Sequence, residues 1–172
     1  MTPHRRWIIC AALTLTAAPS ALAGITCAAS NTTVNFGPYD VLSGAMLPAS
    51  GSIVVTCVNA NVPSTRVAYT ARLAIAPTRQ MAPPVGSDRI AYQIYLDAAH
   101  TQAWGDGTGG TYVITGQMRV RRNRSTTSPP INYYGLITPG GQDVSAASPA
   151  PPPTTYAQTL VVTVTCTPAN PC

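Results

Sequence analysis

Apolar side chains recur at every second position in several separate stretches of this chain. The segment from Asp88 to Gly107 shows the pattern most clearly, because one row of alternate residues there is apolar and the other is mixed. The apolar row is Ile90, Tyr92, Ile94 and Leu96, and the other row is Ala91, Gln93, Tyr95 and Asp97. A period of two is typical of a strand with one buried face. Since no long stretch after residue 23 repeats at three and four residues, the sequence predicts an all-β fold.

Strand signals occur in several segments that turn-forming residues separate from one another. The segments are 25–36, 52–58, 65–76, 89–97, 111–121, 131–137 and 155–166. Apolar rows of consistent parity within them include Ile53, Val55 and Cys57; Val67, Tyr69, Ala71, Leu73 and Ile75; and Tyr112, Ile114, Met118 and Val120. The polar, proline-rich stretch 139–153 can only be a loop before the last strand. Six or seven short strands with this spacing are typical of an immunoglobulin-like β-sandwich.

The first 23 residues have the form of a secretory signal peptide. Arg5 and Arg6 precede a short apolar run, and residues 21–23, Ala-Leu-Ala, have the small-x-small form of a signal peptidase site. The apolar run is short for a membrane anchor, and no other segment is long enough to span a bilayer. We therefore expect export through the periplasm, cleavage after residue 23, and one mature domain at 24–172 that is not inserted in a membrane.

The mature part contains eight arginines, five aspartates and neither lysine nor glutamate, which gives a formal charge of +3. Four of the arginines lie in the run from Arg119 to Arg124, where the strand alternation turns Arg119 and Arg121 towards water. A solvated outer face is the simplest account of them. Nucleic acid is disfavoured as a partner, because export removes it and no aromatic residues are interleaved for base stacking. Whether the run binds an acidic polysaccharide stays open.

Four cysteines remain once the signal peptide, with Cys10, has been removed. They are Cys27, Cys57, Cys166 and Cys172. An even number in an exported chain indicates disulfide bonds, and four cysteines allow three pairings. Proximity in sequence favours Cys27 with Cys57 and Cys166 with Cys172, the first closing a loop worth about 3 to 4 kcal/mol. A zinc site is disfavoured, because the spacings match no zinc ribbon or finger.

Groups that could carry catalysis are few. His100 is the single histidine after residue 23, and Asp97 with Asp106 is the only plausible pair of carboxylates for glycoside hydrolysis. All three lie where turns favour such residues, and Trp104, which opens a glycine-rich turn, is expected to pack on the sandwich rather than on a sugar. We therefore expect no enzymatic activity, and no catalytic, cofactor or metal site.

Several motifs, in this order along the chain, together resemble the spore coat protein U domain. The resemblance covers nearly the whole mature chain, and its most specific part is the turn Trp104-Gly105-Asp106-Gly107 after a Tyr-x-x-Tyr strand, combined with the two early cysteines. The other motifs are Asn35-Phe36-Gly37-x-Tyr39, Gly51-Ser52-Ile53-Val54-Val55-Thr56-Cys57, Arg79-Gln80-Met81, Ala91-Tyr92-Gln93-Ile94-Tyr95, Tyr134-Gly135-x-Ile137 and a closing strand over 156–165.

The resemblance implies an incomplete immunoglobulin-like sandwich that lacks its last strand. Members of this family are pilin subunits of archaic chaperone–usher fimbriae and related secreted coat proteins. In such a subunit an open acceptor groove is filled first by a strand of a periplasmic chaperone and later by an extension of the next subunit. Here the groove would be lined by Leu160, Val162 and Val164, and the expected partners are the pilus chaperone, the outer-membrane usher and neighbouring pilin subunits.

The chain departs from the family pattern at both ends. Cleavage after residue 23 would leave only Gly24, Ile25 and Thr26 before Cys27, too few for a donor strand, so we expect a subunit of a cell-surface fimbria that occupies the tip or terminates assembly. The tail 167–172 runs past the usual end of such domains. The alternative is a secreted coat or matrix protein that completes its own sandwich with the segment 28–39. A carbohydrate-binding module or hydrolase that uses Trp104, Asp97 and Asp106 ranks third.

Overall fold

The computed structural model describes residues 24–30, 34–37, 44–74, 79–82, 88–140, 142 and 160–168. Within them the protein is all-β, which confirms the predicted fold class. No helix long and apolar enough to cross a membrane occurs in this part of the chain. The expected signal peptide, most of the expected loop 139–153, and Cys172 lie outside the described residues.

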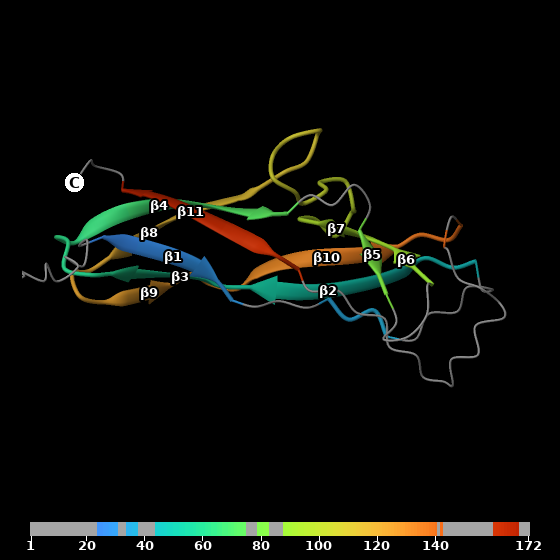
Figure 1. The fold of residues 1–172 in the computed structure, drawn as a ribbon, viewed down its shortest axis with the longest axis horizontal. Helices are drawn as coiled ribbons and strands as arrows, with labels where there is room; N and C mark the ends of the chain where they lie inside the picture. Colours follow the sequence, from blue (N-terminus) through green and yellow to red (C-terminus); the bar gives the residue numbers. More distant parts are fainter. Residues whose placement is uncertain are drawn as a thin grey trace, which may run out of the picture.

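Eleven strands follow one another among these residues (Figure 1). They are β1 (Ile25–Ala29), β2 (Leu47–Ile53), β3 (Val55–Asn59), β4 (Thr65–Leu73), β5 (Gln80–Met81), β6 (Ile90–Ala91), β7 (Gln93–Tyr95), β8 (Ile114–Val120), β9 (Ser125–Thr127), β10 (Ile131–Ile137) and β11 (Val162–Pro168).

The strands pair into a two-layered sandwich. One layer joins the ladders β1-β3-β9 and β2-β10-β7, because β2 runs on into β3 and β9 runs on into β10. The other layer has the order β11-β4-β8, and a small hairpin-like pair, β5-β6, lies towards one end (Figure 1). All of these ladders are antiparallel.

The break between β2 and β3 falls at Val54, where the strand changes partners. Side-chain hydroxyls replace the missing ladder bonds there: the Val54 amide donates to Ser30 Oγ at 3.2 Å, and the Val55 amide donates to Ser128 Oγ at 3.0 Å. The backbone amides of the two serines donate in return to the carbonyls of Val54 and Val55. The layer therefore bends at this point with the polar groups of its backbone satisfied.

The core lies between the layers and is made by the predicted apolar rows. The residues with the least exposed side chains include Ile53, Val55, Cys57, Val67, Ala71, Leu73, Ile90, Ile94, Trp104, Val120, Tyr133 and Ile137. Two tyrosine rings lie over glycines of the neighbouring strand, Tyr69 over Gly116 and Tyr133 over Gly51. A Cβ at Gly116 would meet Tyr69 Oη at 2.3 Å, so the flat packing of this ring requires glycine.

Several predicted strand limits are wrong. The first expected strand, 25–36, ends at Ala29, and the second begins at residue 47 rather than 52. The fifth begins at Ile114, so Tyr112 does not join the buried row: it forms an isolated bridge with Trp104 and is 49% exposed. The short strands β5 and β9 were not predicted as separate elements, whereas the limits of β10 were predicted correctly. Ile75 lies outside the described residues.

Candidate functional site

The last strand, β11, lies at the margin of its sheet. In the described part of the chain its only ladder is with β4, with Val162, Val164 and Cys166 opposite Leu73, Ala71 and Tyr69. The three β4 residues are buried, whereas the three β11 residues are only partly buried although they pack against the same core. The inward row of β11 therefore reaches the core but is not fully covered.

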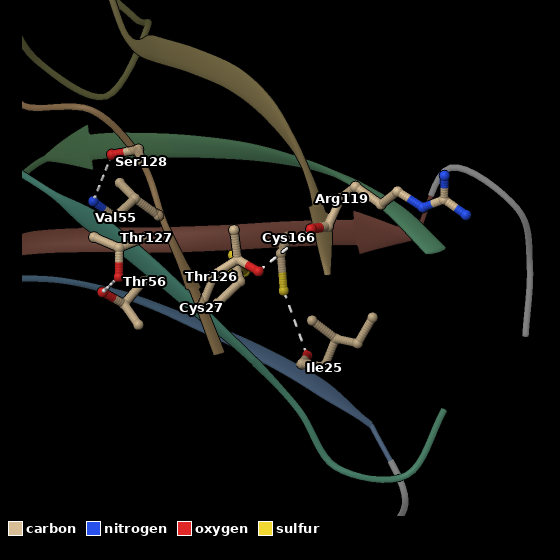
Figure 2. The surroundings of a disulfide bond; sticks show 10 residues. Ile25, Cys27, Val55, Thr56, Arg119, Thr126, Thr127, Ser128 and Cys166 are labelled. Carbon is tan, nitrogen blue, oxygen red and sulfur yellow. Dashed lines mark hydrogen bonds between the residues drawn. A yellow bond between two sulfur atoms is a disulfide. The ribbon is translucent and has the colours of Figure 1, made fainter. Parts of the chain in front are cut away.

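A second sheet margin, β1, lies beside β11. Among the described strands β1 forms a ladder only with β3, and its inward residues Ile25, Cys27 and Ala29 are also only partly buried. The two strands approach each other along the sandwich, yet no ladder joins them (Figure 1). A single side-chain hydrogen bond links the described residues of the two strands: the Cys166 thiol donates to the Ile25 carbonyl oxygen, with Sγ and O 3.5 Å apart (Figure 2). We call this pair of margins the β1/β11 edge.

The residues expected to line an acceptor groove lie on this edge, with different degrees of cover. Val162 and Val164 are half-buried, whereas Leu160 is 6% exposed and already belongs to the core. The β1 residues opposite them were not predicted as part of the site. Their alternation is visible in the sequence, but an alternating strand does not reveal that it lies at a margin.

The segment 34–37 fills the interior at the other half of the sandwich. Val34 and Phe36 are each 8% exposed, and the Phe36 ring meets the Tyr92 ring edge to face at a centroid distance of 5.5 Å. Phe36 also lies over Gly135 of β10, where a Cβ would approach its ring to 2.7 Å. The segment is not a strand, and it ends in a turn in which the Gly37 amide donates to Asn35 Oδ1 and Gly37 has a φ of 70°.

The disulfide between Cys27 and Cys57, favoured by their proximity in sequence, is confirmed. The two residues stand directly opposite each other on β1 and β3, and Cys57 is fully buried (Figure 2). Cys166 is a free cysteine among the described residues. Cys172 lies outside them, so the expected bond between Cys166 and Cys172 stays a prediction. Cys166 lies near the disulfide in Figure 2, on the strand that faces β1.

The turn at residues 104–107 is a structural feature of the core. Trp104 is 1% exposed, its Nε1 donates to the Ala71 carbonyl at 3.3 Å, and its ring packs on Tyr133. This confirms the prediction that Trp104 packs on the sandwich, and a ring so buried has no face left for a sugar. Gly105 lies against Thr111, where a Cβ would meet Oγ1 at 2.5 Å, and Gly107 has a φ of 92°.

The two candidate catalytic carboxylates are engaged by their own loops. Asp106 accepts hydrogen bonds from the hydroxyl and the amide of Thr108, and these two bonds lower its pKa. At Asp97 desolvation opposes the shift, but the hydrogen bonds from Gln102 and Thr101 outweigh it and lower the pKa. A general acid for glycoside hydrolysis needs a raised pKa, so neither carboxyl group is tuned for that role.

His100, the remaining candidate, lies in the same turn. It has a left-handed φ of 57°, and its ring meets Tyr95 edge to face at 5.1 Å. The described residues contain no group of three or more histidine, cysteine or acidic residues placed to hold a metal ion.

Two polar residues, to which the sequence analysis assigned no role of their own, contact the backbone of neighbouring segments. Arg79 donates to the carbonyls of Ala74 and Trp104, and desolvation lowers the pKa of its half-buried guanidinium. The Gln142 side chain bonds both the amide and the carbonyl of Ala91, as a neighbouring strand would. Arg79 belongs to the motif Arg79-Gln80-Met81, which could have indicated it, whereas nothing in the local pattern distinguishes Gln142 from an ordinary surface residue.

The comparisons with known proteins agree with this geometry. The family model described as Spore Coat Protein U domain matches residues 11–163. Protein U of Myxococcus xanthus is 31% identical to this chain over 145 residues, which cover 77% of the chain and 71% of the relative. With a match over most of its length, and with the sandwich just described, the chain belongs to the Spore Coat Protein U domain family.

Proposed function

We propose that this protein is a structural subunit of a cell-surface fimbria, and that its β1/β11 edge accepts a strand from another chain. Its family is one of structural pilin- and coat-type surface or secreted proteins. The observation that carries the proposal is the pair of facing sheet margins, each with an inward apolar row that is only partly covered.

An added strand would complete both margins. Its backbone would pair with β11, whose outer side makes no ladder among the described strands, and its apolar side chains would cover Val162 and Val164. Completing the burial of a half-exposed valine contributes about 1 kcal/mol. The chaperone, the usher and the neighbouring subunits are the proposed sources and handlers of such a strand.

The proposed position is at the tip, or at the end of assembly. The residues that follow the expected cleavage site belong to the domain itself, since Ile25 to Ala29 form β1 and pair with β3. They are therefore not free to enter a neighbouring subunit. The mass of the exported protein tests this placement: a start at Gly24 supports it, whereas self-polymerisation of the purified protein, or a start well upstream, would refute it.

Co-expression with the periplasmic chaperone tests strand acceptance. We expect a stable one-to-one complex, lost in Val164→Asp, which places a charge in the inward row of β11. Val161→Asp is the matched control, because this neighbouring side chain is 61% exposed. The proposal fails if the wild-type protein forms no complex, or if the two variants bind the chaperone equally well.

One observation favours a second candidate, a secreted coat or matrix protein that completes its own sandwich. Val34 and Phe36 already bury themselves in the interior, as a self-completing segment would. This candidate predicts that the protein alone is a stable, soluble monomer, and that the chaperone neither binds nor stabilises it.

A further inference from the structure

Five arginines gather at one end of the sandwich. Arg119, Arg121, Arg122 and Arg124 lie at the end of β8 and in the following turn, and Arg66 lies at the start of β4. All five side chains are exposed. Figure 1 shows this end, with the β8–β9 turn and the loop between β3 and β4, away from β5 and β6. We call these five residues the arginine cluster.

The cluster carries charge that the described residues do not neutralise. Arg66 and Arg119 are direct partners in the β4–β8 ladder and lie on its outer face, an arrangement of like charges that destabilises a sheet. No ion pair joins the cluster to an acidic residue in the described part of the chain. Because arginine stays protonated at any physiological pH, this positive surface is permanent.

The acidic residues of the described part lie elsewhere. Asp88 precedes β6, Asp97 follows β7, and Asp106 interacts with Arg72 near the far end of β4. Arg72 lies six positions along the strand from Arg66, a distance of about 20 Å. Solvent ions screen exposed charges beyond about 8 Å at physiological ionic strength, so these aspartates leave the cluster's field intact.

The backbone that presents the cluster is held in place. Asn59, which is 1% exposed, bonds the amide and carbonyl of Val62 with its side chain, and its own amide donates to the Arg124 carbonyl at 3.0 Å. Arg122 Nε donates to Asn61 Oδ1 at 2.8 Å, whereas the other four guanidinium groups of the cluster have no hydrogen-bond partner among the described residues. A fixed backbone lowers the entropy cost of binding an extended ligand.

We propose that the arginine cluster binds the carboxylate groups of an acidic polysaccharide. Each guanidinium offers a planar fork of donors that matches a carboxylate, and the mature chain uses arginine alone, without lysine. A single-stranded nucleic acid would require aromatic platforms and a lipid surface an apolar face, whereas the intervening residues Val120 and Asn123 are a buried valine and a turn asparagine. The inference does not depend on strand acceptance.

Binding to polygalacturonate tests the proposal, with neutral dextran as the blank. The variant R119S/R121S should bind about tenfold more weakly than wild type, as expected for the loss of two exposed ion pairs. The matched control R72S/R89S removes the same net charge elsewhere and should leave the affinity unchanged. Unfolding midpoints equal to that of wild type exclude misfolding as the cause.

Further measurements address the chemistry and the partner class. R119K/R121K keeps the charge but removes the planar forks, so we expect an affinity between those of wild type and the serine variant. The site is refuted if R72S/R89S weakens binding as much as R119S/R121S does. The partner class is refuted if oligo-dT or anionic phospholipid vesicles bind more tightly than polygalacturonate at the same ionic strength.

Discussion

Reduction of the disulfide between Cys27 and Cys57 should destabilise the fold by a predictable amount. The bond ties β1 to β3 across a sequence separation of 30 residues. In the chain-entropy model, a loop of this length corresponds to about 3.7 kcal/mol in the free energy of unfolding. For a domain of this size the same change corresponds to a fall of about 10 °C in the melting temperature.

Thermal and urea unfolding with and without reductant measure this effect. The double variant C27A/C57A should be insensitive to reductant. The control C166A should stay as sensitive as wild type, because Cys166 is free in the structure. The reasoning is refuted if C166A abolishes the sensitivity to reductant. It is also refuted if reduction lowers the free energy of unfolding of the wild-type protein by less than about 1 kcal/mol, far below the expected loss.

Further predictions concern the interior and the pH dependence of the fold. Phe36→Ala should cost about 3 kcal/mol, because it empties the space between Tyr92 and Gly135. Urea unfolding of this variant and of the control Tyr112→Ala, which removes an exposed ring, checks the prediction. Equal losses in the free energy of unfolding for the two variants would contradict it. Burial raises the pKa of Tyr92 to about 12. The stability that the neutral Tyr92 side chain contributes is therefore complete below about pH 10, its unfolded pKa, and should be lost as the pH rises towards 12. Tyr92→Phe should remove part of that loss. If the dependence of stability on pH were the same in the variant and the wild type, Tyr92 would not be its cause. The lowered pKa of Asp97 implies stability that is complete above its unfolded pKa and is lost as the pH falls through the folded one. Acid unfolding of Asp97→Asn should consequently depend less on pH below about pH 4 than wild type does.

The sequence predicts which side of each strand is buried better than it predicts where the strands end. Alternate residues are apolar where one face of a strand is buried. Ile53, Val55 and Cys57 therefore share the core face, as their spacing predicts, despite the break at Val54. The break itself depends on Ser30 and Ser128, which come from distant parts of the chain. Likewise, the loss of Tyr112 from its row depends on its bridge to Trp104.

The candidate site could be predicted only in part, for the same reason. The alternation of Val162 and Val164 indicates an inward row, and the resemblance to the family suggested that it lies at a margin. That β1 is the other margin depends on sheet order, which no local pattern encodes. Phe36 was expected at the end of the strand 25–36, but β1 already ends at Ala29, so Phe36 is buried without belonging to a strand.

Hydrogen exchange in β11 tests strand acceptance most directly. The exchange of amides at residues 160–167 would be compared between the exported protein alone and its complex with the chaperone, with β4 as the internal reference, since β4 has ladders on both sides. If the β1/β11 edge accepts a strand, β11 exchanges faster than β4 in the protein alone and slows markedly in the complex. If β11 is already as protected as β4 in the protein alone, and the complex changes nothing there, the sandwich is complete by itself and the account is wrong.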